Sequence, residues 1–437
     1  MKKRRWHKLT AILTAVLLLC SGCSLDVEQF LRPPKTQGEQ QAVQTALETY
    51  IRDSGQAGNY MLCYPVEGDY TAAFVLCDDT GKPLTDEERD AALALAFYAI
   101  PSSPTDTHIN FLRREGEEWV SVADVVGAAA DILQVAFGDL DGDGTAELLT
   151  GWDTYNSRDH RLTVFSLSRP LTRLSDDRVY NRLFVGDFSA GGRDSLLLFR
   201  IASGEVTATM ETLDNDTLTP LGQVMLDAEI QQFTGMALCR LDNAVHGLYV
   251  DAIKGTDTAI TELIYYDADG LHAPLCNQAG RVNTATARPA GFAMRDIDGD
   301  AQIEIPLCTL LPNVVVSDST ADYAYCTDWM AWNHTTQNWN TKMSTVMNTA
   351  DGYLVLLDEQ YKETVSSTYE PRERLLTLSN AQSKQPLLRL RPVTKDREDR
   401  YTTLFAAADG YGGCEVWFDS DVLDIDAVRY MVLRLTD

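Results

Sequence analysis

The 437-residue sequence lacks most of the short motifs that identify catalytic sites. It has no GxSxG elbow, no SxxK, no P-loop and no GxGxxG, which argues against elbow-type hydrolases and nucleotide-binding folds. Only six histidines are present, and none belongs to an HExxH or another metal-binding pair. We interpret the five histidines beyond the N-terminal segment as surface or hairpin residues: His108, His160, His246, His272 and His334.

Positive charge is also scarce. The chain has 37 lysines and arginines against 64 acidic residues, which gives a formal net charge of −27. Such an acidic chain is a poor partner for nucleic acid or for an anionic membrane surface. Beyond Cys23 no CxxC pair occurs, and most of the cysteines there lie in apolar runs, so we expect small buried thiols rather than a disulfide framework.

Long hydrophobic runs are absent beyond the N-terminus. There, a basic head is followed by an apolar run at Leu9–Leu19, which is too short for the about 20 residues that a membrane span needs. The run fits a secretory signal, with ordinary secretion or an uncleaved anchor as alternatives. The segment Ser21-Gly22-Cys23 resembles the bacterial lipoprotein signal, which implies removal of residues 1–22 and a lipid on Cys23.

This resemblance also predicts the location of the protein. Residues 23–58 become a lipid-anchored tether and lead-in, with a helix predicted over Gly38 to Arg52. Removing the five basic residues of the signal changes the net charge from −27 to −32. We expect a protein anchored to the cell membrane by its lipid alone and facing the extracellular side.

The sequence does contain two acidic loops, VAFGDLDGDGTAELL and DIDGDAQIE, in which oxygen-bearing side chains occur at the same alternate positions. Calcium takes six to eight oxygen ligands at about 2.3–2.6 Å, and glycine permits the tight turn that gathers them. We therefore predict calcium as the cofactor, whereas magnesium rarely has an all-protein cage. The predicted ligands are Asp139, Asp141, Asp143, Thr145 and Glu147 in the first loop, and Asp296, Asp298, Asp300, Gln302 and Glu304 in the second.

Two alternatives to this interpretation are an EF-hand and an Asp/Gly turn without metal. An EF-hand places its glutamate at position 12, where these loops have Thr150 and Leu307. Both loops place the acid at position 9, and their flanks are short apolar runs typical of strands. The second loop has Ala301 in place of a glycine, and alanine tolerates a positive φ poorly.

Weaker copies of the loop begin at Asp78, Asp187 and Asp242, and the copy at Asp187 has lost most of its acids. Each of the five loops is followed by an alternating hairpin such as HINFLRREGEEWVSV, so one unit of about 50 residues has four strands. A blade of a β-propeller has this number of strands and about this repeat length. Five units occupy residues 59–345.

The loops and their apolar flanks resemble the FG-GAP or VCBS repeat of integrin-α-type propellers; FGDLDGDGTAELL matches closely and MRDIDGDAQIEI nearly as well. The resemblance implies calcium in these loops and a role in adhesion or ligand binding. We predict a mainly β fold, a propeller of about five such blades and at most seven. Residues 346–437 would form a small α+β domain with a weak resemblance to Mog1/PsbP-like domains. The overall arrangement resembles that of a group of lipoproteins from Firmicutes.

The leading hypothesis is a surface-anchored, non-catalytic calcium-binding protein whose propeller binds or scaffolds a protein or glycan ligand. One alternative is a polysaccharide-active enzyme, either a glycoside hydrolase or a lyase, and another is an accessory subunit of an envelope complex. Trp329, Trp332 and Trp339 lie in one hairpin and could form a sugar platform, although packing at a blade edge explains them better.

Overall fold

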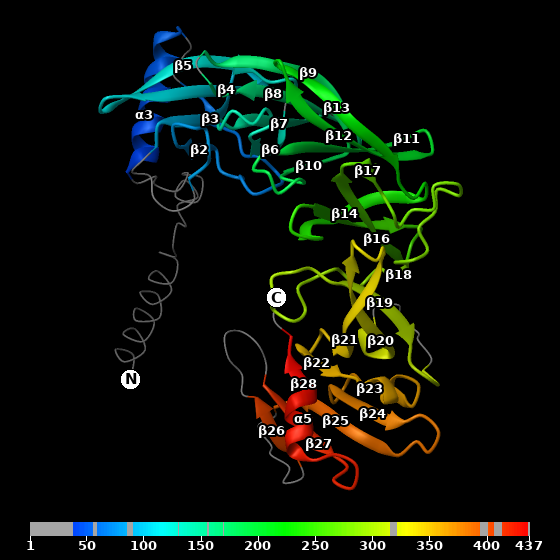
Figure 1. The fold of residues 1–437 in the computed structure, drawn as a ribbon. Helices are drawn as coiled ribbons and strands as arrows, with labels where there is room; N and C mark the ends of the chain where they lie inside the picture. The colour runs from blue at the N-terminus through cyan, green and yellow to red at the C-terminus, as the bar shows by residue number, and fades with distance from the viewer. Residues whose placement is uncertain are drawn as a thin grey trace, which may run out of the picture.

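The computed structural model describes nine segments of the chain: 38–55, 59–84, 91–129, 131–154, 157–168, 170–314, 321–393, 401–405 and 413–435. The predicted signal, Cys23 and most of the tether lie outside these residues. None of the described helices is both long and apolar enough to cross a membrane. The described chain is mainly β, as predicted, and its strands form six antiparallel sheets that follow one another in sequence (Figure 1).

The first sheet carries the N-terminal helix α3 on one face. Its strands are β1 (Met61–Leu62), β2 (Phe74–Cys77), β3 (Leu93–Ile100), β4 (Ser103–Glu115) and β5 (Glu118–Val126), and β1 and β2 share one edge of β3. Helix α3 (Glu39–Asp53) coincides with the prediction within one residue at each end. It buries Val43, Leu47 and Ile51 against small side chains of β3 such as Ala94 and Ala96.

The second and third sheets are plain four-stranded meanders, in which each strand pairs with the next along the chain. The second has β6 (Asp131–Gly138), β7 (Glu147–Asp153), β8 (His160–Ser166) and β9 (Thr172–Tyr180). The third has β10 (Arg182–Gly186), β11 (Ser195–Ala202), β12 (Glu205–Asp214) and β13 (Thr217–Met225). The turn Asn215-Asp216 has positive φ at both residues, 48° and 61°, which suits a two-residue hairpin.

The fourth sheet has β14 (Ile230–Arg240), β15 (His246–Lys254) and β16 (Thr258–Asp267), with two short strands, β17 (Gly270–His272) and β18 (Arg288–Pro289), sharing the outer edge of β16. The fifth has β19 (Ile305–Leu310), β20 (Tyr325–Asn333), β21 (Asn338–Asn348) and β22 (Tyr353–Leu356). The short helix η2 (Asp322–Ala324) precedes β20. Far along the chain, β28 (Val432–Arg434) returns to pair with β22.

The sixth sheet consists of β23 (Val365–Glu370), β24 (Leu375–Asn380), β25 (Pro386–Pro392), β26 (Thr402–Phe405) and β27 (Cys414–Phe418). Helix α4 (Glu359–Lys362) precedes it and helix α5 (Ile425–Met431) follows it. Helix α5 begins at Ile425 because the Asp424 carboxylate caps it by accepting the Ala427 N–H at 2.7 Å. The predicted division at residue 345 falls inside β21, and β22 and β28 belong to the fifth sheet.

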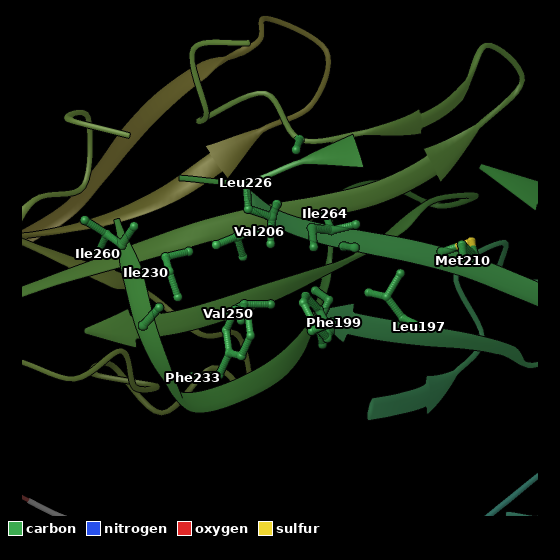
Figure 2. Packing of buried hydrophobic residues seen from close by; sticks show 14 of the residues in the cluster. Leu197, Phe199, Val206, Met210, Leu226, Ile230, Phe233, Val250, Ile260 and Ile264 are labelled. Atoms are coloured by element: carbon green, nitrogen blue, oxygen red, sulfur yellow. The ribbon is translucent and has the colours of Figure 1, made fainter. Parts of the chain in front are cut away.

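One hydrophobic cluster lies at each junction between consecutive sheets. The cluster between the third and fourth sheets joins Leu197 and Phe199 of β11 to Ile230 and Phe233 of β14 (Figure 2). Equivalent clusters join the other neighbouring sheets. Each junction buries one face of two sheets, so apolar burial holds the sheets together pair by pair.

The sheets lie along an arc, with the first and sixth sheets at its two ends (Figure 1). The two faces of β3 explain one end of the arc. Leu95 and Phe97 face the second sheet, whereas Ala96 and Tyr98, on the opposite face, pack against α3. Helix α3 therefore covers the face on which a closed ring of blades would place another sheet.

Candidate metal centre

The first acidic loop connects β6 to β7 and is organised by the carboxylate of its first residue. Asp139 Oδ1 accepts the Gly142 N–H at 2.7 Å, and Asp139 Oδ2 accepts the Gly144 N–H at 3.0 Å. Gly142 and Gly144 have φ values of 79° and 88°, which a side chain would disfavour. The glycines of the motif thus turn the backbone around Asp139.

Three of the five predicted ligands come together in this loop. Asp139, Asp141 and Glu147 each place one carboxylate oxygen within 4.8 Å of the other two. Asp143 lies at the outer turn, where its Oδ1 accepts the Thr145 N–H at 2.7 Å. The site therefore offers several hard oxygen atoms around one point, which is the donor set that calcium prefers.

Glu147 is the buried floor of the site. Its residue is 1% exposed, and its Oε2 accepts the Leu140 N–H at 2.9 Å. Burial, together with the charges of Asp141, Asp143 and Asp139, raises the pKa of Glu147 to about 8. Burial and the neighbouring carboxylates also raise the pKa of Asp141. A bound cation would remove this uncompensated negative charge.

The second loop, which leads into β19, repeats the same frame. Asp296 Oδ1 accepts the Gly299 N–H at 2.7 Å, and Asp296 Oδ2 accepts the Ala301 N–H at 2.9 Å. Ala301 takes a φ of 63°, so alanine occupies the left-handed conformation that glycine has in the first loop. The carboxylate oxygens of Asp296, Asp298 and Asp300 lie within 4.8 Å of one another.

Glu304 is the counterpart of Glu147 in this loop. It is fully buried, its Oε2 accepts the Ile297 N–H at 3.2 Å, and its Oε1 has no hydrogen-bond partner among the described residues. Burial raises its pKa to about 7, with contributions from Asp298 and Asp300. Glu304 is not part of the group of three converging aspartates, but its orphaned oxygen is a buried polar atom that a cation would satisfy. Gln302, the remaining predicted ligand, lies in the same turn and donates its N–H to Asp300 Oδ1 at 2.9 Å.

A lysine distinguishes the second loop from the first. Lys342 of β21 places its Nζ 2.7 Å from Asp300 Oδ2 and 4.0 Å from Asp298 Oδ2. Its hydrogen bond lowers the pKa of Asp300. The role of Lys342 could not be predicted from the sequence, because no local pattern links a lysine in a later hairpin to the loop. The second loop thus already has a cation of its own.

The weaker copy at Asp187 keeps the turn and lacks the ligands. Asp187 Oδ1 accepts the Ser189 N–H at 2.9 Å, and its Oδ2 accepts the Gly192 N–H at 2.6 Å. The position of Thr145 in the first loop is taken here by Arg193. Its guanidinium donates to Leu140 O at 3.0 Å and to Leu213 O at 2.9 Å, so it points to the neighbouring loop.

The first loop also joins the second sheet to the third. The buried carbonyl of Leu140 accepts the Leu213 N–H at 3.1 Å and the Thr212 hydroxyl at 2.8 Å, in addition to Arg193. Asp194 donates its N–H to Asp139 O at 2.9 Å, and its carboxylate accepts the Asp139 N–H at 3.0 Å. The Leu140 side chain is fully buried in the cluster between the two sheets.

Neighbouring loops repeat this arrangement. Ala146 of the first acidic loop donates its N–H to Thr80 O of the preceding loop at 2.8 Å. His246 donates its N–H to Phe188 O at 3.0 Å, which joins the Asp187 loop to the fourth sheet. The loops that follow β2, β6, β10 and β14 therefore form a continuous line of hydrogen bonds from the first sheet to the fourth.

The histidines and tryptophans take structural roles. Four histidines lie beside a carboxylate, in the pairs His108–Asp124, His160–Asp153, His272–Asp267 and His334–Asp242. The fifth, His246, places its Nδ1 2.8 Å from Asp187 O. Trp329 is fully buried, and Trp332 packs edge-on against Trp339. The described cysteines beyond Cys23 are all free thiols, as expected.

Comparisons with known proteins assign neither a family nor an activity to this chain. Neither a protein-family model nor a curated protein matches it. An exotype rhamnogalacturonan lyase is similar in structure at 14% identity and a TM-score of 0.31, covering 75% of this chain and 63% of the lyase. A rhamnogalacturonan lyase from Bacillus licheniformis is similar at 13% identity and a TM-score of 0.31, covering 74% of this chain and 65% of the lyase.

A putative 6-phosphogluconolactonase from Bacteroides uniformis is similar at 14% identity and a TM-score of 0.29, covering 74% of this chain and 95% of that one. The matched regions span 63% to 68% of the length of the three lyases found. The similar structures have propeller-type folds.

Proposed function

We propose that this chain is a calcium-braced, non-catalytic binding protein, built from FG-GAP/VCBS-like blades and held at the outer face of the cell membrane by a lipid on Cys23. Its array of sheets would present loops to a protein or glycan ligand. Two features of the sequence support the proposal: the DxDxDGxxE loops and the lipoprotein-like N-terminus.

The observation that carries the calcium role is the position of the first loop. Its carboxylates converge above the buried Glu147, and its backbone joins the second sheet to the third. Asp139, Asp141 and Glu147 would hold calcium, with Asp143 and Thr145 completing the shell. A cation bound there neutralises charge that otherwise strains the junction, so calcium would stabilise the packing of two sheets.

Calcium would bind the folded loop and not the unfolded chain, and it would therefore stabilise the protein by mass action. At a free concentration 100 times the Kd the gain is about 2.7 kcal/mol. We expect removal of calcium by a chelator to lower the melting temperature, and Asp141→Ala to remove most of the difference between calcium and chelator. Thermal denaturation followed by circular dichroism measures both effects.

The matched variant is Asp298→Ala, which changes the same position of the second loop. Because Lys342 already compensates that loop, this variant should keep most of the stabilisation by calcium. Equal melting temperatures with calcium and with chelator would show that the loops are turns without metal.

The anchor is tested separately. Cys23→Ala should abolish incorporation of labelled palmitate and release the protein from the membrane fraction, whereas Cys20→Ala should leave both unchanged. Labelling of the Cys23→Ala variant would contradict the assignment of the lipidation site.

A further inference from the structure

The strongest unassigned feature is a polar cavity. It lies at one end of strands such as β10 and β14, whose other ends lead into the acidic loops. It has a volume of about 410 Å³, within the roughly 300–1,000 Å³ typical of small-molecule sites. Its walls come from the first four structural units: Glu67, Arg158, His160, Asn181, Arg182, Ile201, Gln231, Gln232 and Phe233. Strands β10 and β14 begin at this cavity and end at the Asp187 and Asp242 loops.

Two β-bulges shape the cavity wall. Along a regular strand successive side chains point to opposite faces, yet both Gln231 and Gln232 line the cavity. The pairing of β14 with β15 shifts between Ile230 and Gln232, which allows this arrangement. A second bulge in β6 leaves Leu133 O to accept the N–H groups of Val66 and Glu67 at 2.9 and 2.8 Å. It fixes Glu67 beside the cavity.

Two guanidinium groups line the cavity of this strongly acidic protein, those of Arg158 and Arg182, together with the carboxylate of Glu67. The carboxylates of Asp153 and Asp159 bond to the lining residues His160 and Asn181. Arg182 forms an ion pair with Glu67, so Arg158 is the guanidinium left for a ligand. Within the described part of the chain the Arg158 guanidinium has no ion-pair or hydrogen-bond partner.

The remaining lining residues indicate what accompanies the negative charge. The amides of Gln231 and Gln232 likewise have no hydrogen-bond partner among the residues that the structure describes. Amides both donate and accept, which complements hydroxyl groups. Phe233, 6% exposed, and the partly buried Ile201 supply an apolar part of the wall. A cavity of this size would be mostly empty around a phosphate or acetate ion alone.

From this geometry we propose that the cavity binds an acidic sugar, with a hexuronic acid unit as the ligand. The Arg158 guanidinium pairs with the sugar carboxylate, because its planar fork matches a carboxylate in two hydrogen bonds. Gln231 and Gln232 bind ring hydroxyls, and the C–H face of the ring rests on the partly buried Ile201. The inference deepens the proposed function by naming the ligand class, and it rests on that function only in treating the chain as a binding protein.

Isothermal titration calorimetry with D-galacturonate and D-glucuronate at millimolar concentrations tests the proposal. D-Galactose supplies the ring without the carboxylate, and acetate supplies the carboxylate without the ring. We expect at least one uronate to bind at least tenfold more tightly than either probe. Binding of neither uronate, or equal binding of galactose or acetate, would overturn the proposal.

Variants locate the ligand in this cavity. Arg158→Ala should weaken uronate binding at least tenfold, and Gln232→Ala should weaken it less. Arg161→Ala, an exposed arginine one residue beyond His160 and outside the cavity lining, is the matched control and should bind normally. Equal losses in Arg158→Ala and Arg161→Ala would indicate general charge attraction and contradict the site.

The ion pair offers a gain of function. Glu67→Gln removes the one carboxylate of the lining and releases Arg182, so uronate binding should strengthen by severalfold. Weaker binding in this variant would contradict the charge argument. Titrations in calcium and in chelator, compared with the melting experiments, distinguish failure of this site from failure of the calcium proposal.

Discussion

The two acidic loops share one frame and differ in what surrounds it. In each, the first aspartate accepts backbone N–H groups around the turn and a glutamate lies buried at position 9. The first loop bonds through Leu140 O to the third sheet, whereas Ile297 of the second packs on its own fifth sheet. Lys342 neutralises part of the second loop, and no such lysine contacts the first among the described residues.

This difference teaches that the motif determines the turn, while its neighbours determine its role. The first loop joins two sheets, and within the described residues no cation pairs with its carboxylates, so a metal there would influence an interface. The second loop has its own cation and contacts mainly its own sheet, so a metal there would add less.

The largest loss of stability should come from Leu140→Ala, which changes the second residue of the first loop. Leu140 is fully buried between two sheets, and leucine-to-alanine changes in cores cost about 2–5 kcal/mol. Ile297 is only partly buried, so Ile297→Ala should cost clearly less. Urea denaturation of the two variants measures both. Equal losses would contradict a special role of the first loop at a junction.

The metal-free protein should lose stability as the pH rises. Burial raises the pKa of Glu147 to about 8 and that of Glu304 to about 7, above the ordinary value of 4.5. Between 4.5 and these values the folded state holds protons that the unfolded state has released, so the free energy of unfolding decreases with pH.

Each group can contribute at most about 1.4 kcal/mol per pH unit. In urea denaturation of calcium-free protein from pH 5 to 8, Glu147→Gln should flatten the decline more than Glu304→Gln. The same slope in Glu147→Gln as in the parent protein would rule out this origin.

Removing the lysine should make the second loop more like the first. The Lys342–Asp300 pair is partly exposed, and such pairs contribute about 0.2–1 kcal/mol, so Lys342→Met should strengthen calcium binding by up to about fivefold. Calorimetric calcium titration in an Asp141→Ala background isolates the second loop. Lys362→Met, which removes a lysine paired with Asp328 instead, is the control and should change nothing.

The smallest effect concerns the backbone of the second loop. Ala301 has a φ of 63°, and a left-handed conformation costs a non-glycine residue roughly 1–2 kcal/mol. Ala301→Gly should therefore raise stability by about 1 kcal/mol or less, after the added flexibility of the unfolded chain is subtracted. Gly144→Ala in the first loop is the reciprocal change and should destabilise the protein. Thermal denaturation in calcium compares the two.

The sequence predicted the parts that depend on local pattern. The helix over 38–52, the mainly β class and the five outer hairpins all follow from periodicity and turn residues, and the structure contains each of them: α3, β4–β5, β8–β9, β12–β13, β16–β17 and β20–β21. The convergence of Asp139, Asp141 and Glu147 also follows from spacing within one turn.

The features that the sequence did not predict depend on contacts between residues that are far apart along the chain. Lys342 meets Asp300 across a later hairpin, and Leu140 O meets Leu213 from the neighbouring sheet. The predicted boundary at residue 345 separated repeats by their acidic loops, although β21 continues through it. The amides of Gln231 and Gln232 share a cavity only because of a bulge, which no alternation pattern announces.

The return of β28 to β22 has a consequence for how the protein is made. The fifth sheet gains this strand only after the whole sequence of the sixth sheet has been synthesised, since β23 to β27 lie between the two partners. Until then β22 has an unpaired edge, and such edges invite association with other chains. A chain that ends before β28 therefore leaves this edge open to misassembly, whereas the complete chain covers it.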